Sequence, residues 1–323
     1  MSLKTNFIGL ELKSPVIAGS CGITADIENL RKIAAEGAGA IILKSVCEEQ
    51  INRDTSYHLE NFYPEEAEYL QHYVKAHAIQ QHIDLIKKAK SELDIPIIAS
   101  INCIRDGEWV HFATELEKAG ADALELNIFM LPINEFIESN VVEQGYFNVL
   151  KHVKSQIKIP IIVKISPYFS NLSAFISKLK AYGANAVTLF NRFYEPDIDV
   201  EHMKIQSATV LSSPEDIRTS LRWTGILAGK DNQLEISAST GVHSGEAVVK
   251  LLLAGATTIQ VCSAIYQQGI ECIGKMNQFI EAWMQEHHFA SIEDFRAKLA
   301  YIHPEQDEYY ERVQFMKYFG DKK

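Results

Sequence analysis

The chain has 323 residues, of which 47% are hydrophobic and 23% charged, and its formal net charge is −11 at pH 7. This balance is typical of a soluble globular protein with a large core. The negative charge argues against a nucleic-acid surface, and the lack of an 18-residue apolar run argues against a membrane span. The N-terminus has no signal-peptide pattern, and the five cysteines are scattered without a C-x-x-C pair. We therefore expect reduced thiols, no metal centre and a cytoplasmic location.

Four segments share one pattern, in which a turn containing glycine is followed by a short apolar run. The turn glycines are Gly37, Gly120, Gly183 and Gly255. Glycine takes the left-handed conformation that ends a helix, and the apolar run after it is typical of a buried strand. The pattern predicts strands over 40–44, 123–127, 186–191 and 258–262.

A second apolar run precedes each of these strands, and the separations are 24 (15 to 39), 25 (96 to 121), 25 (160 to 185) and 23 (234 to 257) residues. These runs cover 15–18, 95–99, 159–163 and 234–238. Amphipathic stretches lie between them, such as the one that follows a candidate N-cap at Thr24. The spacing predicts a strand, a crossover helix and a second parallel strand. Four such units give an α/β fold with eight parallel strands, which closes into a (β/α)8 TIM barrel. The alternative is an open doubly wound sheet, but no G-x-G-x-x-G follows the first strand.

Three connectors, which follow expected strands two, four and six, are longer than ordinary βα loops. They cover 46–95, 128–159 and 192–233. Barrel enzymes build active sites from the loops at the C-terminal ends of their strands, so we interpret these inserted loops as lids or substrate loops. Packing insertions or homodimer contacts are the alternative. Parts look helical, over 65–76 and 214–227, and no linker divides residues 1–323, which we expect to form a single domain.

Polar side chains are expected inside the barrel, because every second residue of a strand points inward. Glu125 and Asn127 share the interior face of one strand, and Lys164 lies on that of the next. A buried lysine is costly unless it meets an anion or strong acceptors, so Lys164 pairs with Glu125, faces a ligand, or does both. Lys44 and Asn191 end their strands at the same mouth. These groups suit an electron-rich, hydrogen-bonding ring system.

The last two strands end in Ser239-Thr240-Gly241 and Cys262-Ser263-Ala264, and a helix is expected after each. Loops seven and eight form the usual phosphate site of this fold, with backbone N–H groups aimed at the anion. Gly241 would let the backbone approach the ligand closely. The residues alone therefore predict a barrel enzyme with a phosphorylated ligand, without naming a flavin.

Taken together, these motifs resemble the dihydroorotate dehydrogenase family, in particular its class 1 branch, over nearly the whole chain. Glu125-Leu126-Asn127 matches the family's Glu-Leu-Asn strand, and Lys44-Ser45 its Lys-Ser pair beside the flavin. The resemblance implies a single FMN-binding barrel that takes part in pyrimidine metabolism. It implies FMN contacts from Gly19, Ser20, Lys44, Ser45, Asn127, Lys164, Thr240, Gly241, Cys262 and Ser263. It implies substrate contacts from Lys44, Asn127 and Asn191, and Arg192, which follows Asn191, is a further candidate for a substrate contact.

The chain departs from this family on the substrate side. Met130 stands where the family has a catalytic cysteine or serine. A thioether has no proton to exchange and cannot act as a general base. Cys103, just past the third strand, is a candidate replacement. Arg192 takes the place of a small residue, which suggests an anionic substrate or a surface salt bridge, and 52–68 does not resemble the family's asparagine-rich loop.

The leading interpretation is an enzyme that passes hydride from a small cyclic, dihydropyrimidine-like substrate to FMN, and then electrons to an unknown acceptor. Two alternatives remain open. One is a non-redox lyase or isomerase that uses Lys164 as a Schiff base on a phosphorylated substrate. The other is a flavin-binding electron-transfer partner with no substrate of its own.

Overall fold

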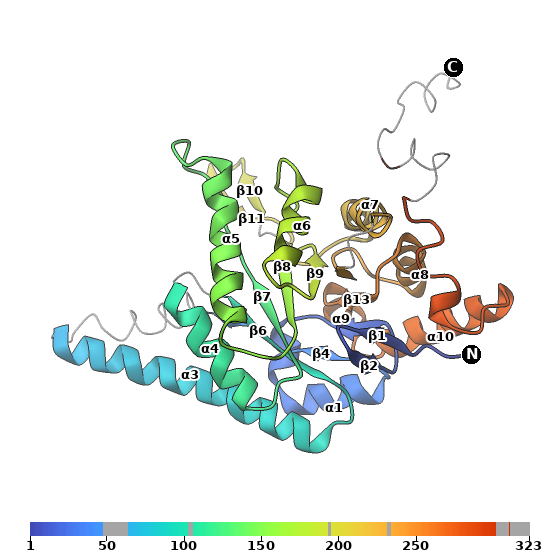
Figure 1. Cartoon of the computed structure of the whole chain (residues 1–323), viewed down its shortest axis with the longest axis horizontal. Coiled ribbons are helices and arrows are strands. Elements are labelled where there is room, and N and C mark those ends of the chain that lie inside the picture. The colour runs from blue at the N-terminus through green and yellow to red at the C-terminus, as the bar shows by residue number, and fades with distance from the viewer. Residues whose placement is uncertain (48–63, 103–105, 193–194, 231–233, 302–309, 311–323) are drawn as a thin grey trace.

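The computed structural model describes residues 1–47, 64–102, 106–192, 195–230, 234–301 and 310. Eight strands alternate with helices along the chain and form a parallel barrel (Figure 1). The barrel strands are β3 Val16–Ala18, β4 Ile41–Ile42, β6 Ile97–Asn102, β7 Ala123–Asn127, β8 Ile161–Ile165, β9 Ala186–Leu189, β12 Glu235–Ala238 and β13 Thr258–Val261. They pair in the order β4-β3-β13-β12-β9-β8-β7-β6, and β4 pairs back onto β6, with Ile41 beside Ile97. The predicted TIM barrel is confirmed, and the open-sheet alternative is wrong because no edge is left between β4 and β6.

The helices lie around the outside of the barrel (Figure 1). They are α1 Ile27–Ala35, α3 Pro64–Glu92, α4 Asp106–Lys118, α5 Ser139–Lys154, α6 Leu172–Ala181, α7 Ile217–Ala228, α8 Gly245–Ala254, α9 Ser263–Gln268 and α10 Cys272–Glu286. Short 3-10 turns cover η1 Gly22–Ala25, η2 Pro214–Asp216 and η3 Ile292–Asp294. Helices α3, α5 and α7 lie in the three long connectors, so these connectors combine barrel helices with insertions. The helices predicted within 65–76 and 214–227 are confirmed as parts of α3 and of η2 with α7.

The four turn glycines have the predicted left-handed backbone. The φ angles of Gly37, Gly120, Gly183 and Gly255 are 81°, 102°, 103° and 112°. Each ends a helix and turns the chain into the next strand, as the repeat predicts. The N-cap prediction at Thr24 is wrong: α1 is capped by Asp26, whose carboxylate accepts hydrogen bonds from the next helix N–H groups.

Further short strands lie outside the predicted eight. β5 (Val46–Cys47) pairs with the far end of β6 and continues β4 after a break. β10 (Pro196–Asp199) and β11 (Lys204–Ser207) form an antiparallel hairpin within the third connector. At the N-terminus, β1 (Thr5–Phe7) and β2 (Leu10–Leu12) form another hairpin.

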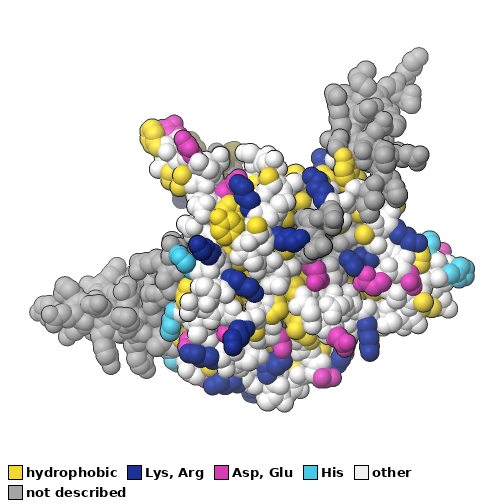
Figure 2. All heavy atoms as spheres, in the orientation of Figure 1, with side chains coloured by type: hydrophobic (Ala, Val, Ile, Leu, Met, Phe, Trp, Pro, Cys, Tyr) yellow, Lys and Arg dark blue, Asp and Glu magenta, His cyan; other side chains and the backbone are white. Residues whose placement is uncertain are grey.

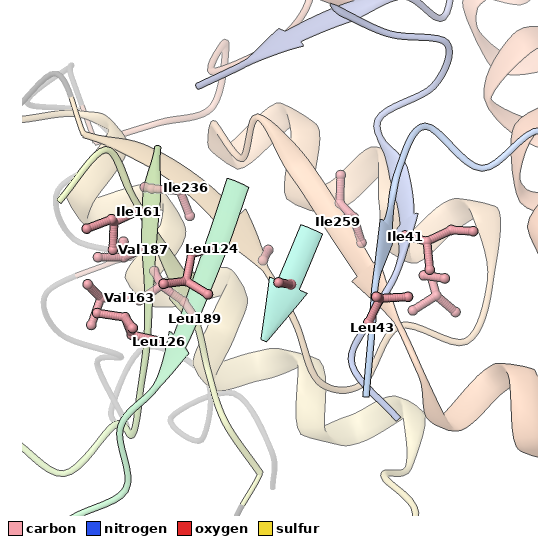
Figure 3. Close-up of a cluster of buried hydrophobic side chains, with 14 of the residues drawn as sticks. Ile41, Leu43, Leu124, Leu126, Ile161, Val163, Val187, Leu189, Ile236 and Ile259 are labelled. Carbon is pink, nitrogen blue, oxygen red and sulfur yellow. The ribbon is translucent and has the colours of Figure 1, made fainter. Parts of the chain in front are cut away.

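The N-terminal hairpin closes the barrel at the end where the parallel strands begin. Phe7 and Leu12 are buried in one cluster with inward-facing strand residues such as Ile98 and Ile162. The residues that alternate with these on the same strands, including Leu124, face the helices in a larger outer cluster (Figure 3). Apolar side chains therefore fill the barrel interior near the N-terminal ends of the strands, and polar side chains lie toward the C-terminal ends.

The surface carries apolar side chains on two loops at the C-terminal ends of the strands. On the loop before α5, Ile133 and Phe136 are each 86% exposed, and on the β10–β11 hairpin Ile205 is 83% exposed. On the face shown in Figure 2, Lys and Arg side chains are interspersed with acidic and apolar ones. Within the described ranges, no helix combines the length and apolar character that a membrane span requires.

Candidate active site

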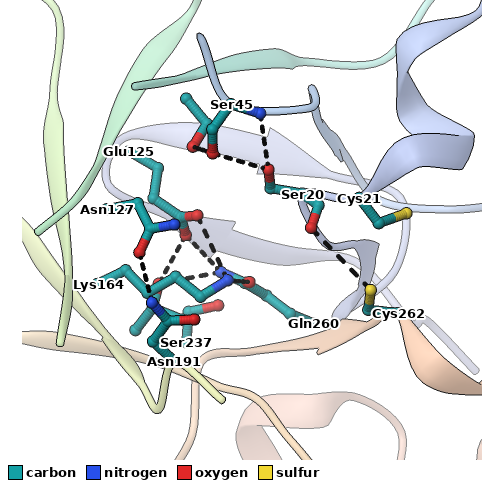
Figure 4. A network of polar contacts seen from close by, with 12 residues as sticks. Ser20, Cys21, Ser45, Glu125, Asn127, Lys164, Asn191, Ser237, Gln260 and Cys262 are labelled. Carbon is teal, nitrogen blue, oxygen red and sulfur yellow. Dashed lines mark hydrogen bonds and ion pairs between the residues drawn. The ribbon is translucent and has the colours of Figure 1, made fainter. Parts of the chain in front are cut away.

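A layer of three polar side chains crosses the middle of the barrel (Figure 4). Gln260 Nε2 donates to Glu125 Oε2 at 2.8 Å and lies 2.9 Å from Thr188 Oγ1. The Thr188 hydroxyl donates to the same carboxylate oxygen at 2.9 Å. The three residues come from β7, β9 and β13, which are alternate strands and therefore contribute to one interior layer.

The three residues of this layer share one position in the sequence repeat. Glu125, Thr188 and Gln260 each stand five residues after a turn glycine, at the offsets 120 to 125, 183 to 188 and 255 to 260. The corresponding residue of the first unit is Ile42. Three polar residues at one repeat position of buried strands therefore mark a built interior site.

Lys164 lies on this layer and is only 8% exposed. Its Nζ is 3.6 Å from Glu125 Oε1 and 3.4 Å from Gln260 Oε1. The predicted buried pair with Glu125 is therefore present. Lys164 also lines the cavity above the layer, so the ammonium can meet a ligand while the carboxylate balances its charge.

The cavity has a volume of about 520 Å³ and lies at the C-terminal ends of the strands. Nine of the predicted site residues line it: Gly19, Ser20, Lys164, Asn191, Arg192, Thr240, Gly241, Cys262 and Ser263. Phe190, Ser212 and Tyr266 are among the lining residues that the sequence did not single out. The structure thus brings strand ends from both halves of the chain to one pocket.

Other predicted residues lie behind the cavity wall. The Ser45 hydroxyl is 3.1 Å from that of Ser20 and 2.7 Å from that of Ser100. Asn191 Nδ2 donates to Asn127 Oδ1 at 2.8 Å, so this amide pair bridges two strand ends. Ser45 and Asn127 therefore contact the cavity-lining residues Ser20 and Asn191 without lining the cavity themselves.

Lys44 is likewise outside the cavity lining, and its carbonyl is 3.2 Å from Nε2 of His82 on α3. No spacing in the sequence pointed to His82, because the long helix α3 alone carries it to the end of β4. Lys44 remains a predicted cofactor and substrate contact.

The loop after β12 has an unusual backbone. Thr240 and Gly241 have consecutive positive φ angles of 74° and 76°. A non-glycine residue in this region is strained, and such strain is concentrated at ligand-binding turns. Gly241 also serves packing: a Cβ there would lie 2.1 Å from the Ile217 nitrogen. The close approach that we expected toward a ligand is thus made by the start of α7.

A serine and a histidine lie beside this loop. Ser212 Oγ is 3.1 Å from His243 Nε2, and the Ser212 N–H donates to Ser263 Oγ at 2.9 Å. Burial lowers the pKa of His243 below its ordinary value, which favours the neutral imidazole. These residues tie the third connector to loops seven and eight.

The substrate side matches the family pattern less well. Met130 does not line the cavity and packs against α5, where a Cβ on Gly145 would lie 3.0 Å from its Cε. Arg192 lines the cavity and donates to the Val210 carbonyl at 2.9 Å. The candidate base Cys103 lies outside the described residues.

A closed α/β barrel with a buried lysine, a polar layer and a cavity at the C-terminal strand ends has the architecture of a barrel enzyme. Comparison with known proteins then shows the family to which the chain belongs. The dihydroorotate dehydrogenase family model matches residues 2–284, so the chain belongs to this family of oxidoreductases, as its motifs predicted.

Three relatives are named dihydroorotate dehydrogenase B (NAD(+)), catalytic subunit. The protein of Thermoplasma volcanium is 24% identical over 304 residues, which is 90% of this chain and 96% of the relative. That of Pyrococcus furiosus is 25% identical over 91% of this chain and 97% of its own length. That of Methanocaldococcus jannaschii is 26% identical over 88% and 94%. The likeness thus covers the barrel from end to end at low identity.

Proposed function

We propose that the protein is an FMN-dependent oxidoreductase that oxidises a small cyclic, dihydropyrimidine-like substrate by hydride transfer to the flavin. The observation that carries this proposal is the placement of Lys164, which is buried, balanced by Glu125 and in contact with the cavity. A cation at that place favours a ligand that gains negative charge when it is reduced.

The residues present fit FMN. Glu125 Oε1 is buried and has no hydrogen-bond partner within the described part of the chain, so the charge of Lys164 compensates it, and Lys164 also lines the cavity. The cavity volume of about 520 Å³ is within the range of cofactor sites. Its wall runs from Lys164 to the Thr240-Gly241 turn and Ser263, which suits a ring at one end and a phosphate at the other.

When bound, FMN supplies a two-electron acceptor for hydride. The chain's own groups would bind and orient the flavin and the substrate. Lys164 would stabilise negative charge on the ring, and Thr240, Gly241 and Ser263 would hold the phosphate. Asn191 lines the cavity, and its bond to Asn127 uses one Nδ2 hydrogen, which leaves the second for a substrate carbonyl.

Dihydroorotate itself is expected to be a poor substrate. Its oxidation needs a base within about 3 Å of the carbon that loses a proton, and the family places that base where Met130 stands. Because Met130 packs against α5, the substrate half of the site differs from the family pattern. We therefore infer a related cyclic substrate, and Arg192 is the group that would bind an anionic substituent.

A Schiff-base lyase is less well supported. Lys164 Nζ lies 3.6 Å from Glu125 Oε1 and 3.4 Å from Gln260 Oε1, and a Schiff base would take its nitrogen out of these contacts. The electron-transfer alternative is compatible with the same cavity and is separated from the enzyme by a substrate screen.

The proposal is tested on the purified full-length protein. Cofactor released by heat should run as FMN on chromatography, and an anaerobic panel of dihydropyrimidines should contain a compound that bleaches the bound flavin. Colourless protein that also fails to bind added FMN would overturn the cofactor assignment. Bound FMN that no panel member reduces would favour the electron-transfer partner. The acceptor, a homodimer and the cytoplasmic location remain predictions.

A further inference from the structure

Two cysteines lie side by side at the wall of the cavity. Cys21 follows β3 and Cys262 follows β13, and these strands are neighbours in the barrel. The Gly19 N–H donates to the Val261 carbonyl at 2.9 Å. This bond extends the pairing of β3 with β13 to the residues just before the two cysteines. Both side chains are partly exposed, and Figure 4 shows them next to Ser20 at the edge of the polar network.

The two thiols lie close together, because Cys262 Sγ is 4.0 Å from the carbonyl oxygen of Ser20, the residue before Cys21. The neighbouring Cys262 thiol, followed by the backbone N–H groups of Thr24 and Ile23, lowers the pKa of Cys21 to about 6 against the effect of burial. The Cys21 thiolate and burial raise the pKa of Cys262.

The pair therefore holds one thiolate and one thiol near neutral pH. A thiolate is the nucleophile of thiol–disulfide exchange, and a second thiol within contact distance resolves the mixed disulfide. Cys272 lacks this arrangement: it is buried, and burial raises its pKa to about 11. Neither Cys21 nor Cys262 has a part as a redox group in the proposed hydride transfer.

We propose that Cys21 and Cys262 form a redox-active dithiol that a low-molecular-weight disulfide oxidises to an intramolecular disulfide. The Cys21 thiolate attacks one sulfur of the disulfide R–S–S–R, forms a mixed disulfide and expels R–S⁻. Cys262 then attacks the Cys21 sulfur, expels the second R–S⁻, and its proton passes to that leaving thiolate. The two protein thiols are oxidised and R–S–S–R is reduced to two R–SH, so atoms and electrons balance.

The position gives this reaction a consequence for the cavity. Cys262 lines the pocket together with Gly19 and Ser20. Closing the sulfurs to a bond of about 2.0 Å ties the ends of two barrel strands together at that wall. The ratio of disulfide to thiol in the surroundings would then determine whether the wall of the ligand site is cross-linked. This inference stands on the contacts of the two cysteines and is independent of the proposed substrate.

The test uses glutathione disulfide on the reduced full-length protein under anaerobic conditions. Alkylation after denaturation counts the thiols, which should fall by two from the five in the sequence. Peptide mapping should recover Cys21 joined to Cys262, and added dithiothreitol should restore both thiols. At pH 6 the thiolate fraction, corrected for lower nucleophilicity, predicts reaction about 20-fold faster than an unperturbed thiol.

Matched variants separate the two steps. Cys262→Ser should stop at the mixed disulfide and carry one glutathione on Cys21, whereas Cys21→Ser should react at neither position. Cys272→Ser, as the control, should still lose two thiols. Loss of thiols at other cysteines, or a wild-type protein whose Cys21 keeps glutathione without forming the internal bond, would overturn the proposal. Counting thiols in the wild type needs no variant, so a variant that fails to fold leaves the test intact.

Discussion

Replacing Lys164 with methionine tests the centre of the site, because it removes the charge and nearly keeps the volume. Two unit charges 3.6 Å apart interact by about 4–5 kcal/mol at an effective dielectric constant of about 20. The Glu125 side chain is 0% exposed, so water does not replace the lost ammonium. Removing one partner of a buried pair costs about 3–5 kcal/mol, and we expect this loss in the free energy of unfolding of Lys164→Met.

The double variant Lys164→Met/Glu125→Gln separates the core role of the lysine from its ligand role. Glutamine keeps an oxygen that can accept from Gln260 and Thr188, and it leaves no buried charge. Most of the lost stability should therefore return, whereas FMN affinity should stay low. Urea unfolding of cofactor-stripped protein, followed by circular dichroism, measures the first quantity, and fluorescence titration with FMN measures the second.

The control is Lys118→Met, which breaks an exposed ion pair with Glu115. Surface pairs contribute about 0–1 kcal/mol, so this variant should unfold and bind FMN nearly as the wild type does. If Lys164→Met matched Lys118→Met in stability, the buried pair would not be an important part of the core. If the double variant bound FMN as tightly as the wild type, the ligand role of Lys164 would be refuted.

Three further predictions concern the mouth of the barrel. Met130→Cys should raise flavin bleaching by dihydroorotate by less than the 10²-fold or more that a positioned base typically contributes, and fast bleaching by the unmodified protein in stopped flow would contradict our account of the substrate half. Gly241→Ala should destabilise the protein in thermal unfolding more than Gly9→Ala, because both glycines have positive φ but only at Gly241 would a Cβ meet backbone. Iodoacetamide labelling of Cys21 should be half-maximal near pH 6 and level off at higher pH, since only the thiolate reacts, while Cys272 stays slow; a midpoint near pH 9 for Cys21 would show an ordinary thiol.

The barrel could be predicted because its signals are local. A turn glycine with positive φ, an apolar run and a helix of regular length recur, and each follows from the backbone geometry of a few neighbouring residues. Short features without periodicity were missed. The β10–β11 hairpin has one isoleucine in each strand, Ile198 and Ile205, so its alternation is too short to be recognised from the sequence.

The candidate site could be predicted as far as strand alternation extends. It placed Glu125 and Lys164 inside the barrel, and the structure brings them together. Gln260 stands at the same repeat position as Glu125, but its contacts with Glu125 and Lys164 depend on which strands share a layer once the barrel is closed. Contacts from the connectors, such as Ser212 with His243, depend on loop paths that no spacing encodes.

The difference between strand residues and loop residues matters for the choice of substrate. The repeat places residues on the barrel strands and at their ends, and these are the residues that would hold the flavin. Met130 and Arg192 follow strands β7 and β9, on loops that can change without disturbing the barrel core. In the proposed reaction a proton leaves one atom of the substrate while hydride leaves another, so the proton needs an acceptor, and a thioether supplies none. Under this proposal the substrate would lose that proton to water or to a residue other than Met130, and compounds in which the proton is already acidic are the ones to place first in the panel.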